Sequence, residues 1–332
     1  MLNFCLFGAG RIGKVHAPNI ATHPQTQLCA IYDVDTAAAE DLAGKYGAQV
    51  ASDPASAIGA PGIDAILIGS STDTHLDLID LAIAARKPVF CEKPLHLDLR
   101  RVDECVSSIQ ASGVPVFVGF NRRFDPSHRA VHDGVRNGDI GKVEMVVITS
   151  RDPAPPGADY IKVSGGIFRD MLIHDFDMAR WLLGEEPIEV YATGSCLVDP
   201  EIAKLGDLDT TMVVLRTESG ALCHINTSRR ATYGYDQRAE VFGSEGMLRS
   251  RNERLTKVER SGVDGTRQDP LLHFFPERYR DAYRLELDHF VRAIESGEPL
   301  LVTERDGRQA LALADAALES SQTGQPVAVD VK

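Results

Sequence analysis

The sequence has little that would support a disulfide-rich or metal-dependent protein. Its six cysteines are widely spaced and contain no CxxC pair, which argues against a disulfide framework or a structural zinc site. No HExxH, GxSxG or nucleophilic Cys-His pattern occurs, so neither a zinc hydrolase nor a serine or cysteine hydrolase is expected. His128 and His132 are four residues apart but lack an obvious third ligand. We therefore expect no catalytic metal.

Basic residues are also in short supply. Asp and Glu number 48 against 35 Lys and Arg, a net charge of −13. An acidic surface repels phosphate backbones and anionic headgroups, so neither nucleic acid nor a membrane is expected as a partner. The apolar run at residues 2–7 has no cationic residues before it and is too short for a signal peptide or a membrane span. A cytoplasmic protein of about two domains is expected.

Buried strands alternate with helical segments over the first 120 residues. Short, almost continuous apolar runs that end near glycine or polar residues predict parallel strands at residues 2–7, 28–32, 65–69, 89–91 and 114–120. Between them, good helix formers predict helices at residues 36–46, 75–85 and 98–111. This alternation predicts an α/β domain, residues 1–120, with a doubly wound parallel sheet of the Rossmann type.

A glycine-rich turn follows the first strand. Residues 8–13, GAGRIG, fit the pattern GxGxxG between a strand and a helix. Gly8 would permit the tight turn, Gly10 would let a pyrophosphate approach the backbone, and Gly13 would let helix and strand pack closely. The pyrophosphate would then lie at the helix N-terminus, where unpaired N–H groups favour anions. The turn predicts a dinucleotide cofactor.

Asp33 ends the second strand, twenty residues after Gly13, where a carboxylate can accept hydrogen bonds from the adenosine ribose. Asp33 and Asp35 would repel a 2′-phosphate at about 4 Å by roughly 1–4 kcal/mol per charge pair. NAD is therefore predicted over NADP. In the alternative interpretation the glycines form a purely structural turn and Asp33 only caps the next helix.

Two more strands end in polar residues at the carboxyl edge of the predicted sheet, where such folds bind ligands. Residues 70–75 place Ser70, Thr72 and His75 there, although Thr72 or Thr74 capping the next helix is a compatible alternative. Residues 91–94, CEKP, place Lys93 at the neighbouring strand end. A lysine there can donate to a substrate hydroxyl and stabilise an alkoxide, but an ordinary exposed lysine is an equal alternative.

The segment at residues 164–184 is apolar all round, which predicts one buried helix. Asp170, His174 and Asp177 are spaced i, i+4 and i+7 and would form one polar stripe on it. An Asp four residues before a His can orient it and support its protonation, as a general base requires. A structural Asp-His pair remains an equal alternative.

The second half of the chain alternates apolar and polar residues in stretches typical of a mostly antiparallel sheet, at residues 143–150, 188–198, 209–228, 238–244 and 247–252. Residues 278–294 and 304–323 are predicted as amphipathic helices. We expect an α+β domain over residues 121–332 that binds substrate. A partner subunit is a simple candidate to cover the second face of its sheet.

Several long motifs resemble the Gfo/Idh/MocA family of Rossmann oxidoreductases, named after glucose-fructose oxidoreductase, inositol dehydrogenase and a rhizopine catabolism protein. The similarity lies in FGAGRIG at 7–13, STDTH at 71–75, CEKP at 91–94 and GGIFRDMLIHDFDMARWLLG at 165–184, and it extends over the whole chain. Within the family, SRDPAPP at 150–156 and the string that precedes and includes the last motif resemble the inositol 2-dehydrogenases.

The resemblance implies NAD-dependent oxidation of myo-inositol to 2-keto-myo-inositol (scyllo-inosose), by a homotetramer or a dimer joined through the C-terminal sheet. Another cyclitol or sugar dehydrogenase, acting on scyllo-inositol or an aldose, shares the motifs, and a non-catalytic NAD-binding protein is a remote alternative. It further implies that Lys93, Asp170 and His174 are catalytic, with His174 as general base. The polyol would contact Lys93, Arg123, Asp170, His174, Asp177 and Tyr233. The expected cofactor-binding residues are Gly8, Gly10, Arg11, Ile12, Gly13, Asp33, Ser70, Thr72, His75, Glu92 and Lys93.

Overall fold

The computed structural model describes residues 1–331, and the chain divides into two compact units. The first unit contains Met1–Phe124 and Ala282–Leu311, and the second contains Asp125–Asp281 and the chain from Ala312 onward. The boundary expected near residue 120 lies close to Phe124, but the sequence pattern did not indicate that Ala282–Leu311 returns to the first unit. No helix within residues 1–331 is long and apolar enough to cross a membrane.

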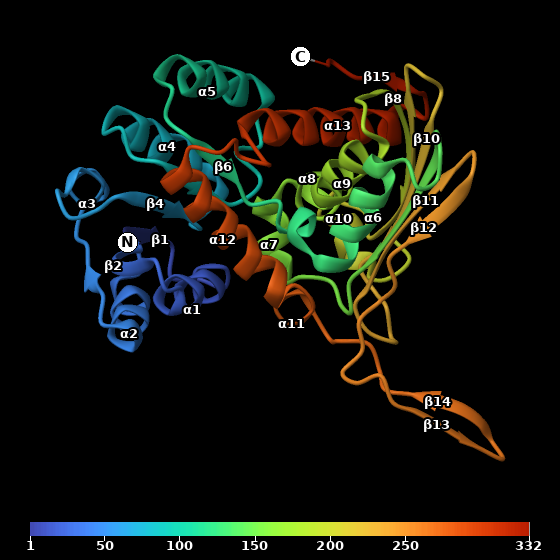
Figure 1. Cartoon of the computed structure of the whole chain (residues 1–332). Helices are drawn as coiled ribbons and strands as arrows, with labels where there is room; N and C mark the ends of the chain where they lie inside the picture. The colour runs from blue at the N-terminus through green and yellow to red at the C-terminus, as the bar shows by residue number, and fades with distance from the viewer. Residues whose placement is uncertain (332) are drawn as a thin grey trace. The chain divides into compact units, whose positions relative to one another are not determined.

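The first unit is built on a six-stranded sheet (Figure 1). Its strands have the order β3-β2-β1-β4-β5-β6, and all neighbouring pairs are parallel. The five expected strands are present with slightly shifted ends, and a short sixth strand, β3, is added. The strands are β1 (Leu2–Phe7), β2 (Thr26–Tyr32), β3 (Gln49–Val50), β4 (Ala65–Ile68), β5 (Val89–Cys91) and β6 (Val116–Val118).

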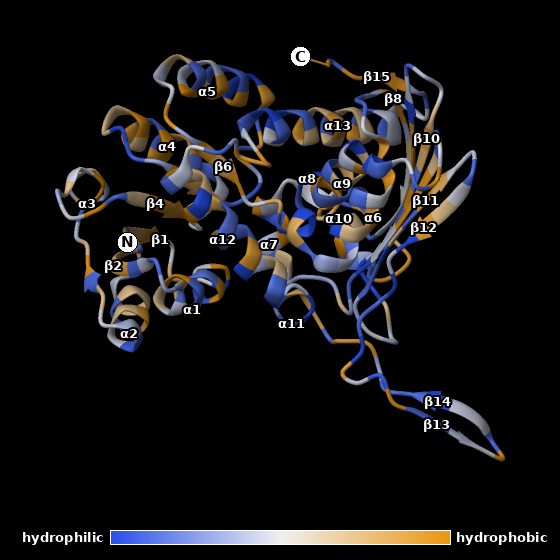
Figure 2. Ribbon diagram, in the orientation of Figure 1, coloured by the Kyte–Doolittle hydropathy of each residue, from blue (hydrophilic) through white to orange (hydrophobic). Residues whose placement is uncertain are grey.

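Central strands of this sheet are inaccessible to solvent, as their continuous apolar sequence requires. All four residues of β4 and all three of β5 are fully buried, and β4 is coloured as an apolar strand in Figure 2. The helices of this unit begin or end at residues suited to those places. Asp98 caps α5 with its carboxylate, and Gly113 ends the helix at a φ of 67°.

Five α-helices lie wholly in the first unit, and the unit boundaries divide two more. They are α1 (Gly13–Thr22), α2 (Thr36–Tyr46), α3 (Pro54–Gly59), α4 (His75–Ala84), α5 (Leu99–Ser112), α12 (Arg280–Ser296) and α13 (Glu304–Thr323). The expected amphipathic helices near the C-terminus are therefore present. The first of them starts at Arg280, because a separate short helix, α11 (Phe275–Arg278), precedes it.

The second unit contains a seven-stranded sheet in the order β12-β11-β7-β10-β9-β8-β15. All neighbouring pairs are antiparallel except β10 and β7, so the expectation of a mostly antiparallel sheet is confirmed. The strands are β7 (Val143–Arg151), β8 (Pro187–Ser195), β9 (Thr210–Thr217), β10 (Leu222–Ser228), β11 (Asp236–Gly243), β12 (Gly246–Arg249) and β15 (Val327–Ala328).

Helices cover one face of the second sheet, and their apolar side chains complete the core of this unit (Figure 1). Phe176, Val146 and Ile225 belong to this core and are at most 3% exposed. A polar hairpin, β13 (Glu259–Gly262) and β14 (Gly265–Gln268), is a separate two-stranded sheet. The remaining helices are α6 (Pro126–Asn137), α7 (Ala158–Ser164), α8 (Gly166–Asp170), α9 (Ile173–Leu183) and α10 (Pro200–Lys204).

The prediction of one continuous helix at residues 164–184 is wrong. Gly165 and Gly166 both adopt left-handed φ angles, 82° and 81°, which end α7 and start α8. A second break follows α8, where the N–H groups of Met171 and Leu172 both donate to the carbonyl of Ile167. Hence the expected polar stripe does not lie on a single helix: its first member ends α8, and the other two lie on α9.

Candidate functional site

The glycine-rich turn after β1 has two glycines that the fold requires and one that it leaves open. Gly8 has a φ of 105°, and a Cβ there would overlap the carbonyl of Gly69. A Cβ at Gly13 would overlap the carbonyl oxygen of Gly8. A Cβ at Gly10, by contrast, meets nothing within 4 Å. This open position at the start of α1 fits the close approach of a dinucleotide pyrophosphate.

Asp33 is bound to the same turn. Its two carboxylate oxygens accept hydrogen bonds from the N–H groups of Ala9, at 2.6 Å, and Asp35, at 2.8 Å. Each carboxylate oxygen can accept a second bond, so capacity remains for ribose hydroxyls. The residue that caps α2 is Asp35, which accepts from Ala37 and Ala38. The alternative in which Asp33 caps that helix therefore does not describe this structure.

His75 joins the ends of β4 and β5. It is 1% exposed, with Nδ1 2.8 Å from the carbonyl oxygen of Pro94 and Nε2 3.2 Å from that of Ser70. Burial lowers the pKa of His75, which favours a neutral ring with one N–H. The shorter contact indicates that this N–H is on Nδ1. The Thr74 hydroxyl donates to the carbonyl of Ser71 and does not cap α4.

Glu92 and Lys93 follow β5 and differ in environment. Glu92 is 6% exposed, and its Oε1 lies 2.6 Å from Nε2 of His16 on α1. Its side chain therefore points into the first unit, whereas Lys93 is only half-buried. The Lys93–Pro94 peptide bond is cis. The expected role of Glu92 in cofactor binding thus stays a prediction, while a contact to His16 was not expected from the sequence.

In the second unit, Asp170 ends α8 and is held by two side chains that the sequence analysis missed. Tyr160 donates its hydroxyl to Oδ1 of Asp170 at 2.8 Å. Nη2 of Arg229 lies 3.5 Å from Oδ2 of Asp170 and 3.7 Å from the carboxylate of Asp207. Arg229 is 1% exposed, so its charge is neutralised by these two carboxylates in the interior. No motif marked Arg229, because its partners are distant in sequence.

His174 lies in the first turn of α9 and is half-buried. Asp177, one turn later, is 1% exposed and lies 3.7 Å from Arg180, which also forms two hydrogen bonds with Glu186. Lys93 belongs to the first unit, and Asp170, His174 and Asp177 belong to the second. The catalytic roles of these residues stay predictions.

Arg123 and Tyr233 both have well-defined partners. Arg123 is 7% exposed and donates to the carboxylate of Asp306, at 2.8 Å, and to the carbonyl of Leu301. Tyr233 is half-exposed, donates to Asp236 at 2.7 Å and accepts from Arg151 at 2.8 Å. Burial and the hydrogen bond to Asp236 raise the pKa of Tyr233. Contacts of either residue with a polyol stay predictions.

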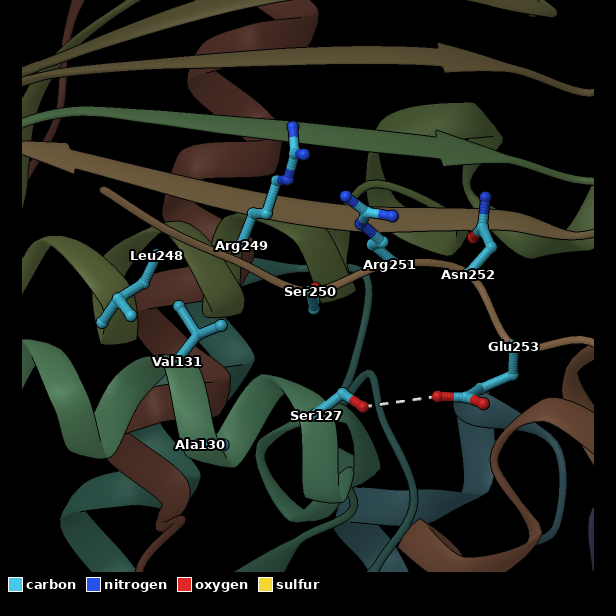
Figure 3. A pocket seen from close by; sticks show the side chains of 9 residues that line it. All are labelled: Ser127, Ala130, Val131, Leu248, Arg249, Ser250, Arg251, Asn252 and Glu253. Carbon is cyan, nitrogen blue, oxygen red and sulfur yellow. Dashed lines mark hydrogen bonds between the residues drawn. The ribbon is translucent and has the colours of Figure 1, made fainter. Parts of the chain in front are cut away.

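A cavity of about 340 Å³ lies in the second unit between α6 and the segment around the end of β12. None of the predicted site residues lines it. Figure 3 shows that Arg249 and Arg251 point away from Ser127 and Val131, so its charged groups do not converge. We do not assign the active site to this cavity.

The histidine pair considered in the sequence has structural partners. Nδ1 of His128 lies 2.9 Å from the hydroxyl of Ser250, and the His132 ring stacks on Trp181 with centroids 4.0 Å apart. Within residues 1–331, one group of three side chains brings potential metal-ligand atoms within 4.8 Å of one another: His16, Glu92 and Glu286.

Comparison with protein families identifies both parts of the chain. Residues 2–120 match the NAD-binding Rossmann fold of the Gfo/Idh/MocA oxidoreductase family, and residues 133–329 match its C-terminal alpha/beta domain. The chain belongs to this family. The resemblance stated from the motifs is thereby confirmed, as are the fold class and NAD as cofactor.

Inositol dehydrogenases are among its relatives, and they match this chain over almost their whole length. An inositol 2-dehydrogenase of Rhizobium meliloti is 50% identical over 319 residues, which cover 96% of each chain. The structure of a myo-inositol dehydrogenase from Corynebacterium glutamicum has 46% identity, a TM-score of 0.95 and 99% coverage of each chain. A scyllo-inositol dehydrogenase from Lactobacillus casei, solved with NAD(H) and scyllo-inositol, has 32% identity, a TM-score of 0.92 and 99% coverage of each chain. This protein is therefore an NAD-dependent oxidoreductase acting on CH–OH groups.

Proposed function

We propose that this protein oxidises myo-inositol to 2-keto-myo-inositol (scyllo-inosose) and reduces NAD. The observation that carries the proposal is the combination of the predicted Lys93, Asp170 and His174 set with 50% identity to an inositol 2-dehydrogenase over 96% of both chains. An uncharged polyol suits a site built from carboxylates, imidazole and phenol, which offers both donors and acceptors.

The reaction requires a proton and a hydride to leave the same carbinol. Bound NAD supplies the hydride acceptor. His174 removes the proton of the hydroxyl group, while the carbon releases its hydrogen with two electrons and the C=O bond forms. Lys93 donates a hydrogen bond to the oxygen and stabilises its developing negative charge.

Asp170 is the orienting carboxylate in this proposal. It carries negative charge that favours a protonated His174 after proton transfer. The bonds from Tyr160 and Arg229 restrict how its carboxylate can rotate, because each oxygen has a partner. Arg229 lies at the longer distance, and its charge is shared with Asp207. This arrangement leaves Asp170 anchored at the end of α8, close in sequence to His174.

A second candidate substrate is scyllo-inositol, which differs from myo-inositol in the orientation of one ring hydroxyl. It is favoured by the similarity to the Lactobacillus casei scyllo-inositol dehydrogenase. The two reactions share the hydride and proton steps and would use the same residues. The choice depends on which ring hydroxyl is presented to His174, and an aldose is a third possibility of the same kind.

The proposal is tested with the purified protein, NAD and a panel of cyclitols and aldoses at alkaline pH, by following NADH absorbance. We expect the highest kcat/KM for myo-inositol and 2-keto-myo-inositol as the product, identified by mass spectrometry. A higher kcat/KM for scyllo-inositol would replace the substrate assignment. No NADH formation with any member of the panel would disprove the proposed function.

We further propose that the enzyme is a cytoplasmic homo-oligomer, a tetramer or a dimer, joined through the uncovered face of the second sheet. Cross-strand neighbours form an apolar row on this face, and all are between 39% and 48% exposed: Met247, Phe242, Met145 and Leu222. Exposed apolar rows of this kind are typical of subunit interfaces. The six free cysteines suit a reducing compartment.

Analytical ultracentrifugation tests the interface with Phe242→Lys, which places a charge in the middle of the row. We expect a smaller assembly that retains its circular dichroism spectrum. Val34→Lys is the matched control, because Val34 is 88% exposed and lies in the first unit. If both variants sediment like the wild type, the interface lies elsewhere.

A further inference from the structure

A cluster of three buried polar side chains includes Glu92, the residue that precedes Lys93. His16 and Glu286 are fully buried and Glu92 is 6% exposed. They come from α1, from α12 and from the residue after β5. The His16 ring packs edge-on against Phe90 and Tyr283, with centroids 5.1 and 5.6 Å away. The His16 side of the cluster therefore packs against aromatic rings, and the cluster lies in a buried environment where an unpaired charge is costly.

The contact with Glu92 shows which ring nitrogen of His16 carries a hydrogen. Its Nε2 lies 2.6 Å from Oε1 of Glu92, and an ionised carboxylate can only accept, so Nε2 carries the proton. Among residues 1–331, no group forms a hydrogen bond with Nδ1 of His16. A proton on Nδ1 would be a buried donor without an acceptor. Nε2 is therefore the ring nitrogen of His16 that donates to Glu92.

Glu286 is the member of the cluster that would have no compensating partner if it were ionised. Neither of its carboxylate oxygens has a hydrogen-bond partner within the described part of the chain. Burial, together with the negative charge of Glu92, raises the pKa of Glu286 well above its usual range. An ionised carboxylate without partners in this place is far more costly than a neutral carboxylic acid. One oxygen of Glu286 and one of the Glu92 carboxylate lie within 4.8 Å of each other.

A metal ion is the other way to hold three such ligands together, and the distances disfavour it. Zinc ligands at 2.0–2.2 Å from the ion in a tetrahedral site lie about 3.3 Å from each other. Nε2 of His16 and Oε1 of Glu92 are only 2.6 Å apart, the distance of a hydrogen bond. A proton therefore lies between these two atoms.

The position of the cluster relates it to the reaction. Glu92 immediately precedes Lys93, and His16 is on α1, the helix that begins at the glycine-rich turn. Gly119 leaves the room that the Glu92 side chain needs, because a Cβ there would lie 3.2 Å from its carboxylate. On the other side of Lys93, the carbonyl of Pro94 is held by buried His75. Both neighbours of Lys93 are thus anchored in the interior by a histidine.

We propose that His16, Glu92 and Glu286 form a positioning triad for Lys93, in which Glu286 is a neutral acid beside the Glu92 carboxylate. The triad links the helix at the glycine-rich turn to the backbone that carries Lys93. It acts through Lys93 and does not itself react. The inference rests on the proposed role of Lys93 in holding the reacting oxygen.

The protonation state is tested by infrared spectroscopy of the full-length protein at neutral pH. We expect the carbonyl band of a protonated carboxylic acid in the wild type and in Glu295→Gln, and its loss in Glu286→Gln. Glu295→Gln is the matched control, because it makes the same change at an exposed position of the same helix. If no such band is lost in Glu286→Gln, or if the purified protein contains stoichiometric metal, the proposal is overturned.

The positioning role is tested by kinetics with two substitutions of Glu286. Leu removes the polar group beside Glu92, so we expect kcat to fall about tenfold or more, while the Kd for NAD stays within about twofold. Gln keeps a neutral donor and should restore most of kcat. Equal losses of kcat in both variants would overturn the role.

Two features keep these tests decisive. If Glu286→Leu does not fold, the kinetics of Glu286→Gln against the wild type still decide. If the wild type oxidises no polyol, the proposed function fails, whereas the infrared and metal measurements need no substrate and still decide the protonation of the triad.

Discussion

The two sheets of this protein bury their residues differently, and the difference explains where each unit carries its chemistry. The parallel sheet is covered on both faces, so its polar groups are found at strand ends, as with Asp33 and Lys93. The mixed sheet has one covered face, and its candidate reactive residues lie on the broken helices α8 and α9. In the first unit the backbone of the glycine-rich turn shapes the proposed cofactor site. In the second unit, pairs of side chains hold the candidate reactive residues in place.

Buried acids show the same contrast. In the second unit, Asp125 and Arg278 form a buried ion pair with two hydrogen bonds, one of them 3.2 Å long. Burial acts to raise the pKa of Asp125, but the hydrogen bonds and charge interactions with Arg278 and His128 together outweigh it and the pKa is lowered. In the first unit, Glu286 has no cation beside it and its pKa is raised. These two buried carboxyl groups thus differ because a guanidinium is paired with Asp125, whereas the charge that acts on Glu286 is that of another carboxylate.

In the proposed mechanism the sharpest division between the units is that the first binds NAD and the second supplies the general base. Replacing His174 with Ala should lower kcat by about 10² to 10⁴-fold, or roughly 3–5 kcal/mol, because proton removal loses its acceptor. The Kd for NAD, measured by calorimetry, should not change. His224→Ala, on β10, serves as the control. Unchanged turnover in His174→Ala would remove this residue from the mechanism.

The contrast between buried acids is tested by Asp125→Asn, which leaves the Arg278 charge without a partner. We expect the free energy of unfolding to fall by about 3–5 kcal/mol near neutral pH, measured by urea titration. Since the folded pKa of Asp125 is lowered from 3.8, the ion pair stabilises the wild type above that pH and loses this effect as the pH falls through the folded value. The two proteins should therefore converge below pH 3.8. A difference that is independent of pH would contradict the ion-pair explanation.

The choice between NAD and NADP tests whether the Asp33 side chain, besides the backbone, contributes to coenzyme binding in the first unit. Asp33→Ser should weaken NAD by about 1.5–3 kcal/mol, roughly 10- to 150-fold, and reduce the exclusion of NADP. The measurement is the ratio of kcat/KM for the two coenzymes. Asp199→Ser is the matched control, because Asp199 caps α10 in the second unit and serine also caps helices well. An unaltered ratio in Asp33→Ser would show that Asp33 does not bind the ribose.

The glycine-rich turn separates an effect on folding from an effect on binding. Gly13→Ala should destabilise the protein by about 1–3 kcal/mol, because its Cβ overlaps the carbonyl oxygen of Gly8. Gly10→Ala should leave the free energy of unfolding within about 0.5 kcal/mol and weaken NAD binding instead. Thermal unfolding and calorimetry measure the two effects. Equal destabilisation by both substitutions would mean that Gly10 has no role specific to the cofactor.

Much of the first unit could be predicted because its signals are local in sequence. Five strands and the glycine-rich turn follow from short apolar runs and glycine spacing. The two-residue strand β3 escaped prediction because Gln49 and Val50 are exposed and too few to form a pattern. The return of Ala282–Leu311 to this unit could not be predicted either, since an amphipathic helix does not indicate which core it covers.

The second unit was harder to predict at the level of the site. Its sheet followed from alternation along each strand, but the spacing of Asp170, His174 and Asp177 suggested one helix where the structure has two. The breaks depend on the left-handed conformation of Gly165 and Gly166 and on a shared acceptor, Ile167. Arg229 was missed because a single arginine in a strand-rich region has no distinguishing pattern.

By itself, the sequence determined the glycine-rich turn, the acidic strand end and the family, because each depends on residues that are close along the chain. Only the tertiary structure decided the pairing of buried charges. His16, Glu92 and Glu286 come from three separate elements, and the state of each depends on what the others bring into the same dry interior. Desolvation and charge interactions act through space, so they take effect only after the chain has folded.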